Sequence, residues 1–93
     1  MMKIKKQLKE IKNEFESKIK ILKEGESFNK KLNEKYSLNL SMPEKNLITI
    51  SLWEWCQQDQ NYTNDSFIKQ IDENNDIDSI FDEIESYIDF RLN

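Results

Sequence analysis

The 93-residue sequence contains no histidine, one cysteine, one glycine and one proline. With no histidine and only Cys56, it lacks a credible ligand set for zinc and cannot form a disulfide within the chain. One glycine is too few for a phosphate-binding loop or a dinucleotide fingerprint. Acid–base and nucleophilic catalysis usually draw on histidine or on a side chain activated by a neighbouring base, and Cys56 has no such neighbour in the sequence. We therefore expect a protein that is not an enzyme and uses no cofactor or metal.

Long apolar runs are also missing. No run approaches the roughly 18 residues that a transmembrane helix needs, and the first ten residues lack the apolar stretch of a signal peptide. We therefore expect a cytoplasmic protein without a membrane partner. The sequence is nevertheless 37 % hydrophobic and 11 % aromatic, which is too apolar for a disordered chain. Its length predicts one small domain spanning residues 1–93.

The beginning of the sequence predicts an amphipathic helix over residues 1–24, because apolar residues recur at spacings of three and four. These residues are Ile4, Leu8, Ile11, Phe15, Ile19 and Leu22. The first four also fit a coiled-coil seam, although Lys18 and Gly25 occupy its next positions. Through such a seam the helix would pair with a second copy in a homodimer. Gly25 is expected to end the helix, and Ser27 to cap a short second helix.

The middle of the sequence predicts a β-hairpin. Residues 36–42 alternate between apolar and polar side chains, and residues 47–52 repeat the pattern with β-branched side chains. Residues 43–46 between them have the composition of a turn. A competing interpretation remains open, because Ser41 to Glu44 also matches a helix capping box that would make residues 43–58 helical.

The last third predicts one or two helices. Residues 63–65 offer caps for a short helix that contains Phe67 and Ile68. The final helix has an apolar face formed by Ile77, Ile80, Phe81, Ile84, Tyr87, Ile88 and Leu92. The expected fold class is α+β, with a long N-terminal amphipathic helix, a central β-hairpin and one or two C-terminal helices. An all-α fold is the alternative.

The segment before the final helix carries oxygen-bearing side chains at the spacing of a calcium-binding loop. These are Asp72, Asn74, Asp76 and Glu83, at loop positions one, three, five and twelve. Ile77 stands where the loop needs glycine for its sharp turn, and Ser79 stands where an apolar residue is usual. A helix that begins after this segment, with acids in its first turn, explains the pattern without metal.

Charge is distributed unevenly along the chain. Residues 1–35 carry a net charge of +5, residues 54–93 carry −9, and the whole chain carries −4. On the final helix four acids form one narrow stripe: Asp78, Asp82, Glu85 and Asp89. Like charges four residues apart repel, so we expect the stripe to meet compensating positive charge. That charge would lie on a basic partner or on the lysine flank of the first helix, or else the stripe is solvated. The lysine flank consists of Lys5, Lys9, Lys12, Lys20 and Lys23.

Aromatic residues supply the other candidate contacts. Trp53 and Trp55 share one side of the predicted strand, opposite the aliphatic side. If the aliphatic side faces the core, the tryptophans are partly exposed, and large aromatic residues are enriched at binding hot spots. The alternative is that one of the flanking helices covers both tryptophans. Phe90 falls outside the apolar face of the final helix and is expected to be exposed. Together with the stripe, the predicted partner-binding set includes Glu83, Phe90, Trp53 and Trp55.

These features indicate a small acidic protein that binds and inhibits a nucleic-acid-handling enzyme, such as a nuclease, by covering its basic site as a nucleic-acid mimic. Phage anti-defence proteins, including anti-CRISPR proteins, and immunity proteins for nuclease toxins are of this kind. The overall acidity argues against direct binding of nucleic acid. The alternative is a dimerisation or assembly module that acts through its first helix. A hydrolase that uses a metal held by the C-terminal carboxylates is a weaker third hypothesis.

Overall fold

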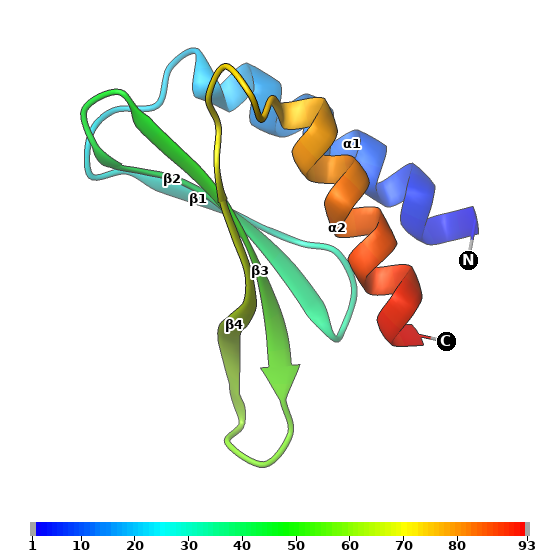
Figure 1. The fold of residues 1–93 in the computed structure, drawn as a ribbon. Helices are drawn as coiled ribbons and strands as arrows, with labels where there is room; N and C mark the ends of the chain where they lie inside the picture. The colour runs from blue at the N-terminus through cyan, green and yellow to red at the C-terminus, as the bar shows by residue number, and fades with distance from the viewer. Residues whose placement is uncertain (1, 93) are drawn as a thin grey trace.

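The structure, a computed structural model, describes the backbone of residues 2–92 and the side chains of residues 5–55, 57–61 and 67–90. Six elements follow one another: α1 (Met2–Ile19), β1 (Ser27–Lys31), β2 (Tyr36–Glu44), β3 (Leu47–Cys56), β4 (Asn61–Gln70) and α2 (Ile77–Leu92). The strands form one antiparallel sheet in the order β1-β2-β3-β4. Both helices lie side by side on one face of this sheet (Figure 1). The predicted α+β class is confirmed.

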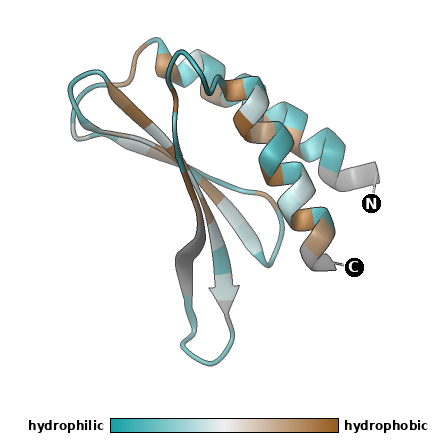
Figure 2. Ribbon diagram, viewed as in Figure 1, coloured by the Kyte–Doolittle hydropathy of each residue, from teal (hydrophilic) through white to brown (hydrophobic). Residues whose placement is uncertain are grey.

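The core fills the space between the two helices and the sheet, where hydrophobic segments of all three face one another (Figure 2). Its fully buried side chains are Phe15, Tyr36, Leu38, Leu40, Ile50, Leu52, Ile80, Ile84 and Ile88. Phe15 of α1 lies at the centre. Its ring makes edge-to-face contacts with Phe28 of β1 and Phe81 of α2, each with ring centroids 5.8 Å apart. One aromatic side chain thus joins both helices to the sheet.

The predicted hairpin is confirmed as β2 and β3. Leu38 lies opposite Leu52, and Leu40 lies opposite Ile50, so the alternating apolar residues of both strands face the helices. The turn places Asn46 at a φ of 66°, a conformation that asparagine tolerates better than most residues. The helical alternative for residues 43–58 is wrong. A helix would have scattered these alternating side chains around its circumference, whereas the strand buries all of them on one face.

Two segments predicted as short helices are strands. Ser27 begins β1 rather than capping a helix, and residues 61–70 form β4. In β4 the side chains of Phe67 and Lys69 face α2, so a lysine interrupts the apolar alternation that would have revealed a strand. The local helix-capping signal at residues 63–65 is overridden because β4 pairs with β3 on both sides of an irregularity, at residues 61–63 and at residues 67–70.

The first helix ends at Ile19, five residues before the predicted end at residue 24. Gly25 lies in the loop that follows, where its φ of 86° is one that glycine adopts easily. There the Gly25 N–H donates to the carbonyl of Met42 at 2.7 Å, and the Met42 N–H donates to the carbonyl of Glu26 at 3.0 Å. Gly25 therefore sets the start of β1 against β2 instead of ending the helix.

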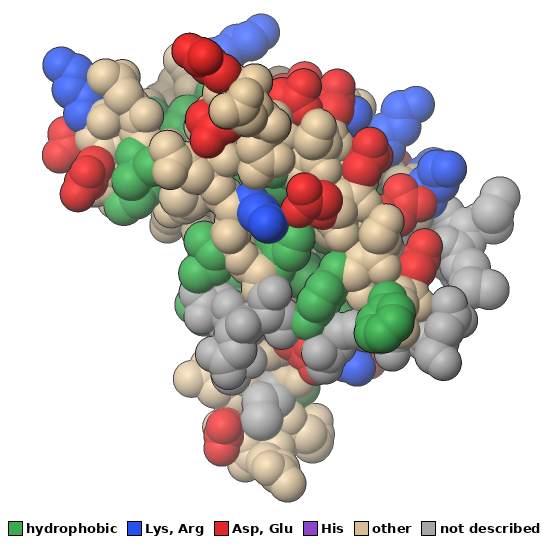
Figure 3. Space-filling model, in the orientation of Figure 1, with side chains coloured by type: hydrophobic (Ala, Val, Ile, Leu, Met, Phe, Trp, Pro, Cys, Tyr) green, Lys and Arg blue, Asp and Glu red, His purple; other side chains and the backbone are tan. Residues whose placement is uncertain are grey.

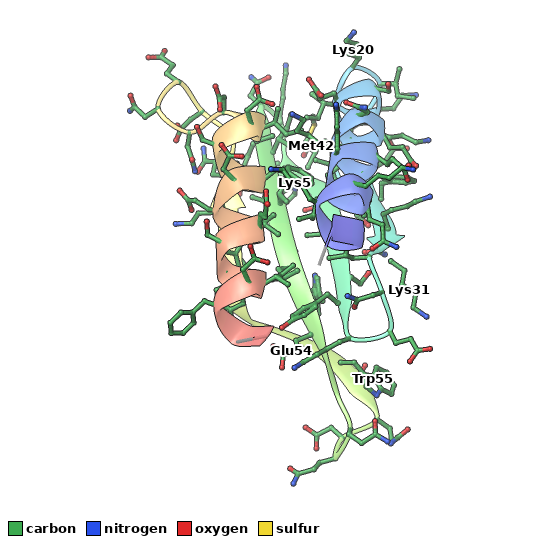
Figure 4. The ribbon with its side chains drawn as sticks, turned by 90° about the vertical axis from the view of Figure 1, so that its right-hand side faces the viewer. Lys5, Lys20, Lys31, Met42, Glu54 and Trp55 are labelled. Atoms are coloured by element: carbon green, nitrogen blue, oxygen red, sulfur yellow. The ribbon has the colours of Figure 1, made fainter. Side chains whose placement is uncertain are left out.

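The hairpin of β3 and β4 extends beyond the ends of both helices (Figure 1). Glu54 lies near the end of α2, and Trp55 lies farther along the hairpin (Figure 4). Within residues 2–92, neither helix has the length and apolar character needed to cross a membrane.

Candidate protein-binding groove

A groove of about 650 Å³ runs between α2 and the edge strand β4. Its lining residues are Phe67, Ile68 and Lys69 of β4 and Asp82, Glu83, Ser86, Tyr87 and Phe90 of α2. The two walls belong to elements that are adjacent in the chain and are joined by residues 71–76. In Figure 3, apolar side chains reach the surface between α2 and β4, and acidic side chains lie beside them.

Aromatic side chains form the floor and one end of the groove. The rings of Phe67 and Tyr87 contact each other across it, with centroids 6.3 Å apart, and both side chains are half-buried. Phe90 is 83 % exposed and Ile68 is 56 % exposed. Scattered single apolar residues are common on protein surfaces, but here two exposed ones line the same groove as two partly buried aromatic rings. The groove therefore combines apolar side chains from both of its walls.

Charged side chains form the rim of the groove. The Lys69 ammonium lies 3.5 Å from the Glu83 carboxylate and 5.7 Å from the centre of the Phe67 ring. Asp82, on the same side of α2, is exposed. Two acids and one lysine leave the rim with a net negative charge. Because Lys69 and Glu83 are both more than 40 % exposed, solvent screens their attraction, and either group can exchange its partner at low cost.

The other side of α2 faces α1, and there the acidic stripe meets lysines. The Lys12 ammonium donates to Asp78 Oδ1 at 2.8 Å. This hydrogen bond raises the pKa of Lys12; partial desolvation opposes the rise, and the charges of Asp78, Glu16 and Asp82 add to it. The seam between the helices is lined by Lys5, Leu8, Lys9, Lys12, Asp78, Phe81, Asp82 and Glu85. Figure 4 shows Lys5 on the side of α1 that faces α2.

The stripe is thus divided between two environments. Asp78 and Glu85 face the lysine flank of α1, as the second interpretation of the charge pattern predicts. Asp82 lies on the crest of α2, where it lines both the seam and the groove. Asp89 is exposed near the end of the helix. The positive charge that faces Asp78 and Glu85 therefore comes from lysines of the protein itself.

The tryptophans lie on a different surface from α2. Ile50 and Leu52 of β3 face the helices, so Trp53 and Trp55 extend from the opposite face of the sheet. Trp53 borders a hollow of about 390 Å³ with Asn29, Ser37 and Asn39. In the part of the chain that the structure describes, no helix covers the tryptophans, because both helices lie on the other face of the sheet. The structure therefore separates the tryptophan pair from Phe90 and the acids, with which the sequence grouped it.

Polar side chains on this opposite face hydrogen-bond to one another. Asn39 Nδ2 donates to Asn29 Oδ1 at 2.6 Å, and the Trp53 indole N–H donates to Ser51 Oγ at 2.9 Å. The hydroxyls of Ser41 and Thr49 lie 3.0 Å apart. The two asparagines and the two hydroxyl residues are cross-strand pairs, which stabilise a sheet, whereas Trp53 and Ser51 both belong to β3.

The predicted calcium-loop residues have structural roles. Asp72 Oδ1 accepts from the backbone N–H of Asn74 at 2.9 Å and closes a tight turn. Asp76 Oδ1 accepts from the Ser79 N–H at 2.8 Å, which makes Asp76 the N-cap of α2. Across the described side chains, no three histidine, cysteine or acidic residues gather closely enough to hold a metal ion.

Replacing Asp76 by alanine is expected to lower the melting temperature by a few degrees at neutral pH, because the start of α2 loses its cap. Hydrogen bonds from the backbone and the hydroxyl of Ser79 lower the pKa of Asp76 below 3.8. A carboxylate with a lowered pKa stabilises the folded state above its unfolded-state pKa, and this effect is lost as the pH falls through its folded-state pKa. The difference between wild type and variant should therefore shrink as the pH falls below 3.8. Thermal unfolding at several pH values tests this, and Asp76→Asn, which keeps a cap, should stay close to wild type at neutral pH.

The sequence identified only part of the groove. Asp82, Glu83 and Phe90 were predicted as partner-binding residues, and the structure brings these three together. Phe67, Ile68 and Lys69 were missed because their segment was predicted as a helix, and Tyr87 was assigned to the apolar face of α2. The available signal was the exposed position of Phe90 outside the main apolar face of its helix. No protein-family model, no curated protein and no solved structure matches this chain, so no relative indicates its function.

Proposed function

We propose that this protein is a small non-catalytic binding protein that inhibits a nucleic-acid-handling enzyme by covering a basic surface of that enzyme. The groove between α2 and β4 makes the contact. The observation that carries the proposal is the position of Phe90, which is 83 % exposed and lines one groove with Asp82 and Glu83. An apolar anchor bordered by acids suits a partner whose apolar contact surface is surrounded by lysine or arginine.

The energetics of association support this arrangement. Burying an exposed aromatic side chain in a partner supplies affinity, and hot spots are enriched in such side chains. Acids at the rim, together with the overall charge of −4, raise the rate of encounter with a basic surface. Asp78 pairs with Lys12, and Glu85 faces the lysine flank. The attraction therefore comes from the exposed Asp82 and Asp89, and from Glu83, which can exchange its exposed partner Lys69 for a basic group of the partner protein.

The alternative function, assembly through the first helix, has less support from the geometry. Leu8, Ile11 and Phe15 of the coiled-coil seam are buried in the protein's own core, with exposed fractions of 4 %, 3 % and 0 %. Ile4 lies outside the described side chains. A second helix could reach the buried seam only if α1 left the sheet, which would expose the core.

The proposal is tested with two double variants that change charge and hydrophobicity equally. The groove variant carries Glu83→Lys and Phe90→Ser. The control variant carries Glu24→Lys and Ile21→Ser, which alter an exposed acid and an apolar residue that is 67 % exposed in the loop after α1. Wild type and both variants serve as bait for proteins of the source cell, and the retained partner is purified for binding measurements.

The groove variant is expected to bind the purified partner at least tenfold more weakly than wild type, since it loses a central aromatic contact worth about 2 kcal/mol or more. The control variant should bind as wild type does. Wild-type association should slow as salt increases, and an equimolar amount should prevent the partner from binding nucleic acid. Equal binding by all three proteins, or a partner without affinity for nucleic acid, would contradict the proposal.

A further inference from the structure

The groove includes the outer edge of β4 itself. Phe67, Ile68 and Lys69 are consecutive residues, and all three line the groove. Successive side chains of a strand point to opposite faces of the sheet, so three in a row can border one groove only where it wraps around the strand edge. β4 is an edge strand, because it pairs with β3 and is last in the sheet order. The groove thus gives access to strand backbone as well as to side chains.

Hydrogen bonding shows which backbone groups point outward. The Ile71 N–H donates to the carbonyl of Ile48 at 2.9 Å, so Ile71 directs its backbone groups toward β3. In an antiparallel strand this direction alternates, which means that Lys69 also faces β3 while Ile68 and Gln70 face away from it. The Gln70 carbonyl accepts from Asn75 Nδ2 at 3.4 Å, at the upper end of the strand. Ile68 therefore directs its N–H and carbonyl away from β3, at a position of β4 that lines the groove.

The facing wall of α2 has the spacing of an extended chain. Glu83 and Tyr87 are four residues apart on the helix, a rise of about 6 Å. Side chains two residues apart on one side of a strand are separated by about 6.6 Å. In a strand that pairs with Ile68, the residues opposite Lys69 and Phe67 would face α2, because directly opposite residues share a face of the sheet. Lys69 lies 3.5 Å from Glu83, and the Phe67 ring contacts Tyr87, so the first of these residues would lie near Glu83 and the second near Tyr87. A basic side chain at the first position would share Glu83 and the exposed Asp82 with Lys69, and an apolar side chain at the second would meet the aromatic rings.

We propose that the partner enters this groove as an extended segment that adds a fifth strand to the sheet along β4, with a basic and an apolar side chain two positions apart facing α2. This inference rests on the proposed function and names the form of the partner's contact. Backbone hydrogen bonds to Ile68 supply affinity, as in other cases of strand addition, while Asp82, Glu83, Tyr87 and Phe90 select the side chains. A second copy of this chain suits the groove less well, because its net charge of −4 opposes contact with an acidic rim.

The test uses two substitutions at one position. Ile68→Pro removes the outward N–H without removing a hydrogen bond between β3 and β4, and proline is tolerated at such positions of edge strands. Ile68→Thr removes the apolar side chain and keeps the N–H. The probe is a random octapeptide display library, selected on wild-type protein and counter-selected on the variant with Glu83→Lys and Phe90→Ser. The most enriched peptide is then synthesised, with and without N-methyl groups on its central backbone amides.

Enriched peptides are expected to carry a basic and an apolar residue two positions apart. Ile68→Pro should weaken peptide binding about tenfold or more, Ile68→Thr by about threefold or less, and backbone N-methylation should weaken binding as Ile68→Pro does. N-methylation gives the same information if Ile68→Pro fails to fold. Enriched peptides whose basic and apolar residues lie three or four positions apart would show that the groove binds a helix. Binding that survives both Ile68→Pro and N-methylation would show that the groove recognises side chains alone. Either result would overturn strand addition. The proposed function would survive that result, provided that the partner still depends on Glu83 and Phe90. An absence of enriched peptides would overturn the inference.

Discussion

Replacing Phe15 by alanine is expected to lower the free energy of unfolding by about 3 to 5 kcal/mol, the usual cost of removing a buried phenylalanine ring. Phe15 is fully buried. Among the described aromatic pairs, its ring is the one that contacts both Phe28 and Phe81. Its removal leaves a cavity where α1, α2 and the sheet meet. For a domain of this size each kcal/mol corresponds to about 4 to 8 °C, so the melting temperature should fall by 12 °C or more.

Chemical denaturation monitored by circular dichroism measures this effect, and two further variants calibrate it. Phe15→Leu fills part of the cavity and should cost clearly less than Phe15→Ala. Phe90→Ala changes the same residue type on the surface and should alter stability by less than about 0.5 kcal/mol. A cost below 1 kcal/mol for Phe15→Ala would mean that α1 does not pack on the core as described.

Placing an aspartate at Ile84 is expected to unfold the protein, whereas the same substitution at Phe90 should leave it folded. Both residues lie on α2, but Ile84 is fully buried and Phe90 is 83 % exposed. At Ile84 the change removes about 2 to 3 kcal/mol of apolar burial and adds the cost of a buried carboxyl group without a designed partner, which is several kcal/mol. A domain of 93 residues has a total stability of about 5 to 14 kcal/mol, so little or no folded protein should remain.

Near-ultraviolet circular dichroism and thermal unfolding distinguish the two variants. The added residue is the same in both variants. Phe90 lies in the last turn of α2, where the helix dipole disfavours a negative charge, so a larger loss of stability at Ile84 is due to its burial. If Phe90→Asp also unfolds the protein, Phe90 has a structural contact, and the variants that test the groove would have to be replaced by changes at Glu83 alone. If Ile84→Asp remains cooperatively folded, α2 does not bury this face against the sheet.

The charge separation along the sequence does not become a charge separation on the surface of the folded protein. Its two halves carry +5 and −9, which suggests two separate surfaces of opposite charge. The fold instead places α1 beside α2, and Lys12 pairs with Asp78 across the seam. What remains for a partner is the outer side of α2, where acids border an apolar groove. Recognition by this protein would therefore combine charge with an aromatic contact and would not depend on the full stripe.

The sequence by itself determined the elements whose apolar residues repeat with a clear period. The face of α1, the hairpin and the face of the last helix were all predicted. The residues of these faces that are buried include Leu8, Ile11, Phe15, Leu38, Leu52, Ile80, Ile84 and Ile88, while Leu92 lies outside the described side chains. The same period placed Phe90 outside the apolar face of its helix, and Phe90 is exposed. Periodicity succeeds here because it reports which side of a single element avoids water, a property of neighbouring residues alone.

Only the tertiary structure decided how those elements meet. β4 is a strand because its backbone pairs with β3, although Lys69 breaks its apolar alternation and a capping signal precedes it. The same pairing places β4 opposite α2 so that Ile68 and Phe90 line one groove, while the position of the helices on one face of the sheet leaves Trp53 on the other. These outcomes depend on hydrogen bonds and contacts between residues far apart in the chain. A local pattern does not specify which distant segment a strand or helix packs against. Each segment can bury its apolar face equally well in several arrangements of the elements.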